Sequence, residues 1–127
     1  MTLKHVALVC SSEERSDKFY KHVLGLKKTS SNVLPATLAK QIFNVAAECQ
    51  FVHYMNDHLH FEIFITACQA VSVRTFEHVC LEVPDVEKFL DTCRTLDVSI
   101  QQIPRGASSL TFIRDYDGNL FEIKPQA

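Results

Sequence analysis

The stretch TFEHVCLEV (residues 75–83) places one histidine at the head of an otherwise apolar, alternating segment. A similar stretch, LKHVALV (residues 3–9), opens the chain. Alternation with a period of two is typical of a β-strand that has one face on a core. Because the same strand is introduced twice by a histidine, the sequence indicates an internal repeat.

The predicted elements follow the same order in both halves of the chain. In the first half we expect a strand over 3–10 and a helix over 11–25, with Ser11 and Glu14 as a capping box and Gly25 as the stop. Phe19, Val23 and Leu24 are expected to form the buried stripe of that helix. After it come LKKTSS, a less regular region over 32–44 with a short helix around 36–43, and strands over 49–55 and 58–65 joined at Asn56-Asp57.

The second half repeats this plan with a shorter middle. A strand over 76–83 precedes a helix over 84–98, with Asp85 as cap and Val86, Phe89, Leu90, Cys93 and Leu96 at helical spacing. Three strands follow, over 99–103, 108–114 and 120–125, the last two joined by the turn DYDGN. The sequence therefore predicts an α+β fold of two β-α-β-β-β modules with curved mixed sheets around a cleft. Module 1 spans about 1–68 and module 2 about 74–125, within a single domain over 1–127.

Four chemically unusual residues occupy equivalent positions in the two modules. His5 and His78 are 73 residues apart, and the matching strands FEIF and FEIK place Glu62 and Glu122 60 residues apart. The alternation of each strand puts its apolar residues against the following helix and these four on the opposite face. All four can thus point into the concave side of one curved sheet.

Two carboxylates brought together away from water repel one another unless a positive charge lies between them. A divalent metal ion supplies that charge, and two imidazoles with two carboxylates suit Zn, Ni, Co, Mn or Fe. Each of these residues alone is more often an ordinary half-buried histidine or a solvated glutamate. The repeat is what favours a metal site at His5, Glu62, His78 and Glu122.

Composition excludes several other classes of protein. The 127 residues carry a formal charge of -2 without a basic cluster, so we expect neither nucleic acid nor a membrane surface as partner. The first apolar run is too short for a signal peptide or a bilayer span, which favours the cytoplasm. Five cysteines without a CxxC pair predict reduced, mostly buried thiols instead of a disulfide framework.

The motifs FYKHVLGL (19–26), FEHVCLEVPDVEKFL (76–90) and RDYDGNLFEI (114–123) resemble the vicinal oxygen chelate superfamily across nearly the whole chain. This superfamily includes glyoxalase I, methylmalonyl-CoA epimerase, extradiol dioxygenases, and the fosfomycin and bleomycin resistance proteins. The last motif departs from the usual D-P-D-G by carrying Tyr116. The resemblance implies a metal ion held by His5, Glu62, His78 and Glu122, in a pattern closest to bacterial glyoxalase I and the epimerases.

The resemblance also implies a reaction. A lyase or isomerase of the glyoxalase type would bind its small-molecule substrate through two oxygens and stabilise an enediolate after proton abstraction, with Glu122 first and Glu62 second as the base. Two alternatives are a binding or resistance protein, with or without metal, and an Fe(II) ring-cleaving dioxygenase. Members commonly pair, so we expect a homodimer, with each site inside one chain or across the interface.

Other residues near the expected site carry weaker signals. A glutathione pocket should show a basic cluster, yet only Arg74, Arg105 and Lys124 are scattered candidates. His60 lies two residues before Glu62, where it can hydrogen-bond a ligand carboxylate or transfer protons. A solvent-exposed histidine at the rim of the site is an equal alternative. Cys80 is expected to be a small packed hydrophobe. His53, Tyr54 and Phe64 are candidates for the pocket lining, with the inward face of their strands left open.

Overall fold

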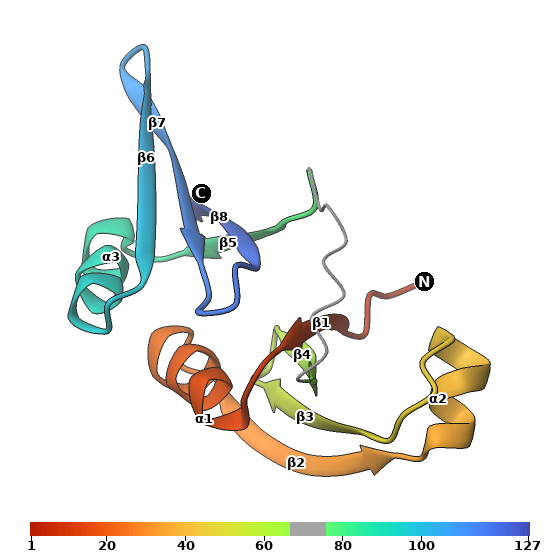
Figure 1. Cartoon of the computed structure of the whole chain (residues 1–127). Coiled ribbons are helices and arrows are strands. Elements are labelled where there is room, and N and C mark those ends of the chain that lie inside the picture. The colour runs from red at the N-terminus through yellow and green to blue at the C-terminus, as the bar shows by residue number, and fades with distance from the viewer. Residues whose placement is uncertain (67–75) are drawn as a thin grey trace. The chain divides into compact units, whose positions relative to one another are not determined.

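The computed structural model describes residues 1–66 and 76–127. The chain divides into two compact units, Met1–Ala70 and Val71–Ala127, and each is described here by itself. Figure 1 draws both units coloured along the chain. The first unit contains β1 Val6–Cys10, α1 Glu13–Ser16, the π-helix η1 Asp17–Val23, β2 Lys27–Leu34, α2 Ala36–Phe43, β3 Cys49–Met55 and β4 His60–Ile65. The second contains β5 Val79–Val83, α3 Val86–Thr95, β6 Ser99–Arg105, β7 Ser108–Arg114 and β8 Leu120–Pro125.

The two units have the same strand connectivity. The first sheet has the order β1-β4-β3-β2 and the second the order β5-β8-β7-β6. In each, the first strand pairs in parallel with the last, and the other neighbours are antiparallel. Val6 lies opposite Phe61, and Val79 lies opposite Phe121, so the predicted offsets of 73 and 60 hold in the register. The expected fold class of two modules with mixed sheets is confirmed, and each unit has its own four-stranded sheet.

The first helix differs from the single α-helix expected over 11–25. Its cap is Ser12, whose side chain accepts a hydrogen bond from the Arg15 backbone N–H, so the Ser11 cap was wrong by one residue. After one α-helical turn the chain continues as the π-helix. Within this π-helix the neighbouring Phe19 and Tyr20 are both fully buried, with Tyr20 against the sheet and Phe19 against Tyr20.

Gly25 ends this helix as predicted. Its φ of +70° lies in the left-handed region, where an L side chain is strained. Beyond it, the Leu26 N–H donates to the Tyr20 carbonyl at 3.0 Å, which satisfies an acceptor at the helix end.

Aromatic side chains form the centre of the first unit. The Tyr20 ring stacks on Tyr54 with a centroid separation of 5.3 Å, and it lies 5.6 Å from Phe61. Val52, Tyr54, Phe61 and Ile63 are buried on the face that meets the helix. Their neighbours in β3 and β4 must therefore point to the opposite face of the sheet.

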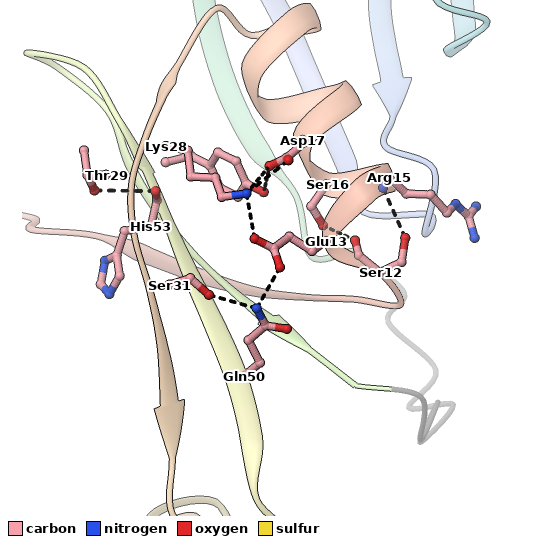
Figure 2. Close-up of polar contacts among 11 residues, drawn as sticks. Ser12, Glu13, Arg15, Ser16, Asp17, Lys28, Thr29, Ser31, Gln50 and His53 are labelled. Carbon is pink, nitrogen blue, oxygen red and sulfur yellow. Dashed lines mark hydrogen bonds and ion pairs between the residues drawn. The ribbon is translucent and has the colours of Figure 1, made fainter.

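A polar network attaches the same helix to the sheet (Figure 2). Lys28 Nζ lies 2.6 Å from Glu13 and 3.1 Å from Asp17. The Tyr54 hydroxyl donates to Asp17 at 2.7 Å, and the Gln50 amide donates to Glu13 at 2.7 Å. Figure 2 shows the His53 ring pointing away from this network.

In the second unit the predicted helix and turn are both present. The Asp85 side chain caps α3 by accepting from the Lys88 N–H, and Leu90 and Cys93 are fully buried. The Asp115 carboxylate accepts the backbone N–H groups of Asp117 and Asn119, which fixes the turn between β7 and β8. The Tyr116 hydroxyl donates to the Leu96 carbonyl and so connects this turn to the end of α3.

The cysteines within the described ranges are all free thiols. Cys10 and Cys93 are buried, Cys49 is half-buried and Cys80 is exposed, while Cys68 lies outside the described residues. Within residues 1–66 and 76–127, no helix has the length and apolar character needed to cross a bilayer.

Candidate metal centre

The first unit places His5 beside Glu62. His5 directly precedes β1, and Glu62 lies in β4 opposite Ala7. His5 Nε2 lies 3.6 Å from Glu62 Oε2, with the side chains 39% and 16% exposed. This separation is longer than a hydrogen bond, so the two side chains lie close together without being hydrogen-bonded to each other.

The second unit repeats the pair with His78 and Glu122. His78 directly precedes β5, Glu122 lies opposite Cys80, and Nε2 is 3.4 Å from Oε2. The side-chain exposures are again 39% and 16%. His78 Nδ1 lies 2.9 Å from the Phe76 carbonyl, which can only accept, so Nδ1 carries the proton. The lone pair is then on Nε2, directed to the carboxylate side.

These distances fit a shared metal ion. Two donors that bind one ion at about 2.0–2.2 Å lie roughly 3.0–3.4 Å apart in octahedral or tetrahedral geometry. The observed N–O distances of 3.6 and 3.4 Å are at or slightly above that range. A metal ion could bind each pair without first breaking a hydrogen bond between the two side chains. In the part of the chain that the structure describes, no group of three or more His, Cys, Asp or Glu side chains is arranged to hold a metal. Each unit thus supplies a pair, and the complete quartet stays a prediction.

A second histidine pair lies next to Glu62. His53 is opposite Glu62 in the register, and its Nδ1 lies 2.7 Å from His60 Nε2. His53 Nε2 is 3.9 Å from Glu62 Oε2. Burial, followed by the neighbouring His53 and His5 rings, lowers the pKa of His60. A neutral His60 can donate to His53 and fix the ring orientation of His53 toward the carboxylate.

The sequence predicted His60 as a neighbour of the ligand carboxylate. In the structure His53 lies between His60 and Glu62. The open question about β3 is resolved by burial. Tyr54 is fully buried against the helix, so it does not line the site, while His53 shares the face of Glu62. The Asn56-Asp57 turn is the sequence feature that could have identified His53, because this turn sets the register of the β3–β4 hairpin. The Asn56 side chain accepts hydrogen bonds from the His58 and Leu59 N–H groups.

Module 2 has a different neighbourhood around its glutamate. Phe112 occupies the position opposite Glu122, and Lys124 Nζ lies 3.5 Å from Glu122 Oε1. Cys80 is exposed, which corrects the packed role expected for it. Desolvation first, and then the Glu122 carboxylate, raises the pKa of the Cys80 thiol, and this disfavours a nucleophilic thiolate.

Arg74 lies outside the described residues, and Arg105 is exposed at the end of β6.

Each unit thus places one histidine beside one glutamate at equivalent positions of the same kind of sheet. The chain belongs to the Glyoxalase/Bleomycin resistance protein/Dioxygenase superfamily, whose family model matches residues 2–123. The expected resemblance to the vicinal oxygen chelate superfamily is confirmed by this match. No curated protein matches the chain.

Solved structures show the same fold at low sequence identity. A point variant of the fosfomycin resistance protein FosX from Listeria monocytogenes, complexed with Mn(II) and 1S,2S-dihydroxypropylphosphonic acid, has a TM-score of 0.75 at 16% identity. The match covers 99% of this chain and 93% of that one. A glyoxalase family protein from Enterococcus faecalis has a TM-score of 0.72 at 18% identity, covering 96% and 95%. A glyoxalase family protein from Bacillus cereus has a TM-score of 0.75 at 14% identity, covering 97% and 92%.

Proposed function

We propose that this protein is a metal-dependent lyase or isomerase of the glyoxalase type. Its substrate is a small molecule that offers two oxygens to one divalent first-row ion, which can be Ni, Zn, Co, Mn or Fe. The ion is held by His5, Glu62, His78 and Glu122, with one histidine and one glutamate from each module. The two modules belong to one chain or to two chains of a homodimer.

The observation that carries this proposal is the duplication of one pair at equivalent positions. Both histidines directly precede the first strand of their sheet, and both glutamates lie in the strand paired with it. The N–O separations differ by only 0.2 Å between the pairs, at 3.6 and 3.4 Å. A structural role would not require both sheets to keep the same polar pair on the same face. The Mn(II) complex of the FosX relative supports a divalent ion in this fold.

The ligands and their neighbours have separate roles in this proposal. A bound ion would polarise a substrate carbonyl and so favour loss of a neighbouring C–H proton. Glu122 takes that proton, a role carried over from the family resemblance, with Glu62 as the second choice. Glu62 Oε2 lies 3.6 Å from the His5 imidazole and 3.9 Å from the His53 imidazole, so it is the carboxylate that would remain a ligand beside His5. The Phe76 carbonyl keeps His78 in the tautomer that leaves Nε2 free to bind.

The test of the chemistry is Glu122→Gln, which preserves the shape of the side chain and removes its basicity. We expect metal to stay bound more weakly, while proton abstraction falls about a hundredfold or more, the scale of a lost general base. The substrate panel is 2-oxoaldehyde thiol adducts and acyl-CoA epimers, assayed with several metals and followed by C–H exchange in deuterated water. The exposed Glu87→Gln on α3 is the matched control. An unchanged exchange rate in Glu122→Gln excludes this residue as the base.

The FosX match favours a second candidate, a small-molecule binding or resistance protein. This candidate predicts ligand binding without turnover on any member of the panel. The ring-cleaving alternative predicts Fe(II)-specific oxygen uptake. The same metal-loaded preparations distinguish all three outcomes.

A further inference from the structure

A continuous row of aromatic rings crosses the first unit, from the candidate metal ligand His5 to the end of α2. Each ring contacts the next, with centroid separations of 5.0 to 5.4 Å. In order, the row consists of His5, His60, His53, Phe51, Phe64 and Phe43. Phe51 and Phe64 are stacked at an interplanar angle of 21°.

The outer part of this row lies on the same sheet face as the candidate ligands. Phe51 is opposite Phe64 in the register, and His53 is opposite Glu62 two positions along. The alternating residues Val52 and Tyr54 are buried against the helix, so Phe51 and His53 point to the other face. Phe51 and Phe64 are half-buried, and Phe43, the last residue of α2, is 52% exposed.

Module 2 carries a charged residue at the position that Phe64 occupies in module 1. By the register, Lys124 is the counterpart of Phe64, and its ammonium lies near Glu122. The second unit connects β6 directly to β7 through a turn at Gly106, whereas the first inserts α2 between β2 and β3. Phe64 and Phe43, which lies on α2, are therefore specific to module 1 and are not needed by the repeated sheet.

We propose that Phe51, Phe64 and Phe43 form an apolar subsite for the substrate of the metal centre. It takes a flat aryl group or a comparable apolar group attached to the metal-binding oxygens. The inference rests on the proposed function, because continuity of the rings with His53 and His5 is what connects the subsite to the metal. Stacked rings favour another flat apolar surface, and these three phenylalanines offer no charge to a carboxylate or a phosphonate. The substrate class is thus an oxygen chelator with an uncharged aryl or apolar substituent.

Two hydroxamic acids test the subsite, because both chelate a first-row metal through two oxygens and differ only in their substituent. We measure the affinity of the Ni(II)-loaded full chain for acetohydroxamic acid and for 2-naphthohydroxamic acid by calorimetry. We expect the naphthyl compound to bind tenfold tighter or more, the scale of an added aromatic contact. Phe64→Ala and Phe43→Ala should each reduce this preference by threefold or more and leave acetohydroxamate binding unchanged. Phe43 is half exposed at a helix end, so its replacement spares the fold.

The exposed Ile103→Ala in β6 is the control and should keep the full preference. Equal affinities of the parent protein for the two acids would overturn the subsite and leave the metal centre standing. A metal-loaded protein that binds neither acid would overturn both. If a second copy of the chain covers the row instead, Phe64→Ala shifts the mass in solution toward the monomer without changing the preference, and the subsite is rejected.

Discussion

At the residue scale, His5 and His78 could be predicted as ligand candidates because their place in a repeated strand pattern is visible in the letters alone. The role of His53 could not, because β3 alternates between two faces and only the hairpin register decides between them. That register places His53 opposite Glu62 and sends Tyr54 into the core, where its hydroxyl donates to Asp17. The sequence therefore predicts the residue types, while cross-strand pairing determines which of them meet.

Lys28 is the residue whose removal tests the polar network. Lys28→Met should lower the free energy of unfolding by about 1 kcal/mol, because Glu13 and Asp17 both lose their charged partner while remaining partly open to solvent. Urea unfolding measures the loss. Lys27→Met, an exposed neighbour in the same strand, should change it by less than about 0.5 kcal/mol. Equal losses in the two variants would show that the network does not stabilise the unit.

The same network predicts an acid dependence. Hydrogen bonds from Lys28 first and Gln50 second lower the pKa of Glu13. Burial alone would raise the pKa of Asp17, but hydrogen bonds from Tyr54 and Lys28 outweigh it and lower that pKa. Groups with a lowered pKa in the fold stabilise it above their unfolded values, here 4.5 and 3.8, and lose this contribution as the pH falls through the folded values. Stability should drop below about pH 4.5, and the drop should be smaller in Lys28→Met.

At the scale of elements, the two β-α-β-β-β modules were predictable because strand alternation, caps and turns agree with one another. The break of the first helix into an α-turn and a π-helix was not. An α-helical period selects Phe19 and Val23 as the buried stripe, but the sheet also buries the adjacent Tyr20, and the wider turn accommodates both. Tertiary packing thus changed the helix type without moving its end at Gly25.

Gly25 gives the element-scale prediction. A Cβ at this position would meet no atom within 4 Å, so the cost of Gly25→Ala comes from its φ of +70° and not from a clash. We expect a loss of about 1 kcal/mol in the free energy of unfolding, measured in urea. Gly25→Asn should lose less, because asparagine adopts left-handed backbone more readily. An equal or larger loss for asparagine would mean that helix termination is not what Gly25 contributes.

At the scale of the whole molecule, family membership explains the repeat and leaves the assembly open to measurement. A homodimer is part of the proposal, with the quartet formed inside one chain or across the interface of two chains. Sedimentation equilibrium of the metal-loaded protein should give a mass near twice the 14.4 kDa of the chain. A particle of one chain mass at micromolar concentration would reject the dimer, and the quartet would then have to come from a single chain.

The central claim is that His5, Glu62, His78 and Glu122 hold one ion, and His78→Ala tests it most directly. The variant should fold, because β5 owes its place to the half-buried Val79 and Val83 and the buried Leu81, none of which changes. Metal analysis after purification without chelators should give one first-row ion per site in the parent protein. His58→Ala, in the exposed β3–β4 turn, should match the parent, and His78→Ala should contain little or no metal.

The same comparison can be followed as stability, because an ion that binds only the folded state raises the melting temperature. A chelator should therefore lower the melting temperature of the parent and of His58→Ala and leave that of His78→Ala nearly unchanged. Metal content in His78→Ala equal to that of the parent would contradict the account, since no arrangement with His78 as a ligand allows it.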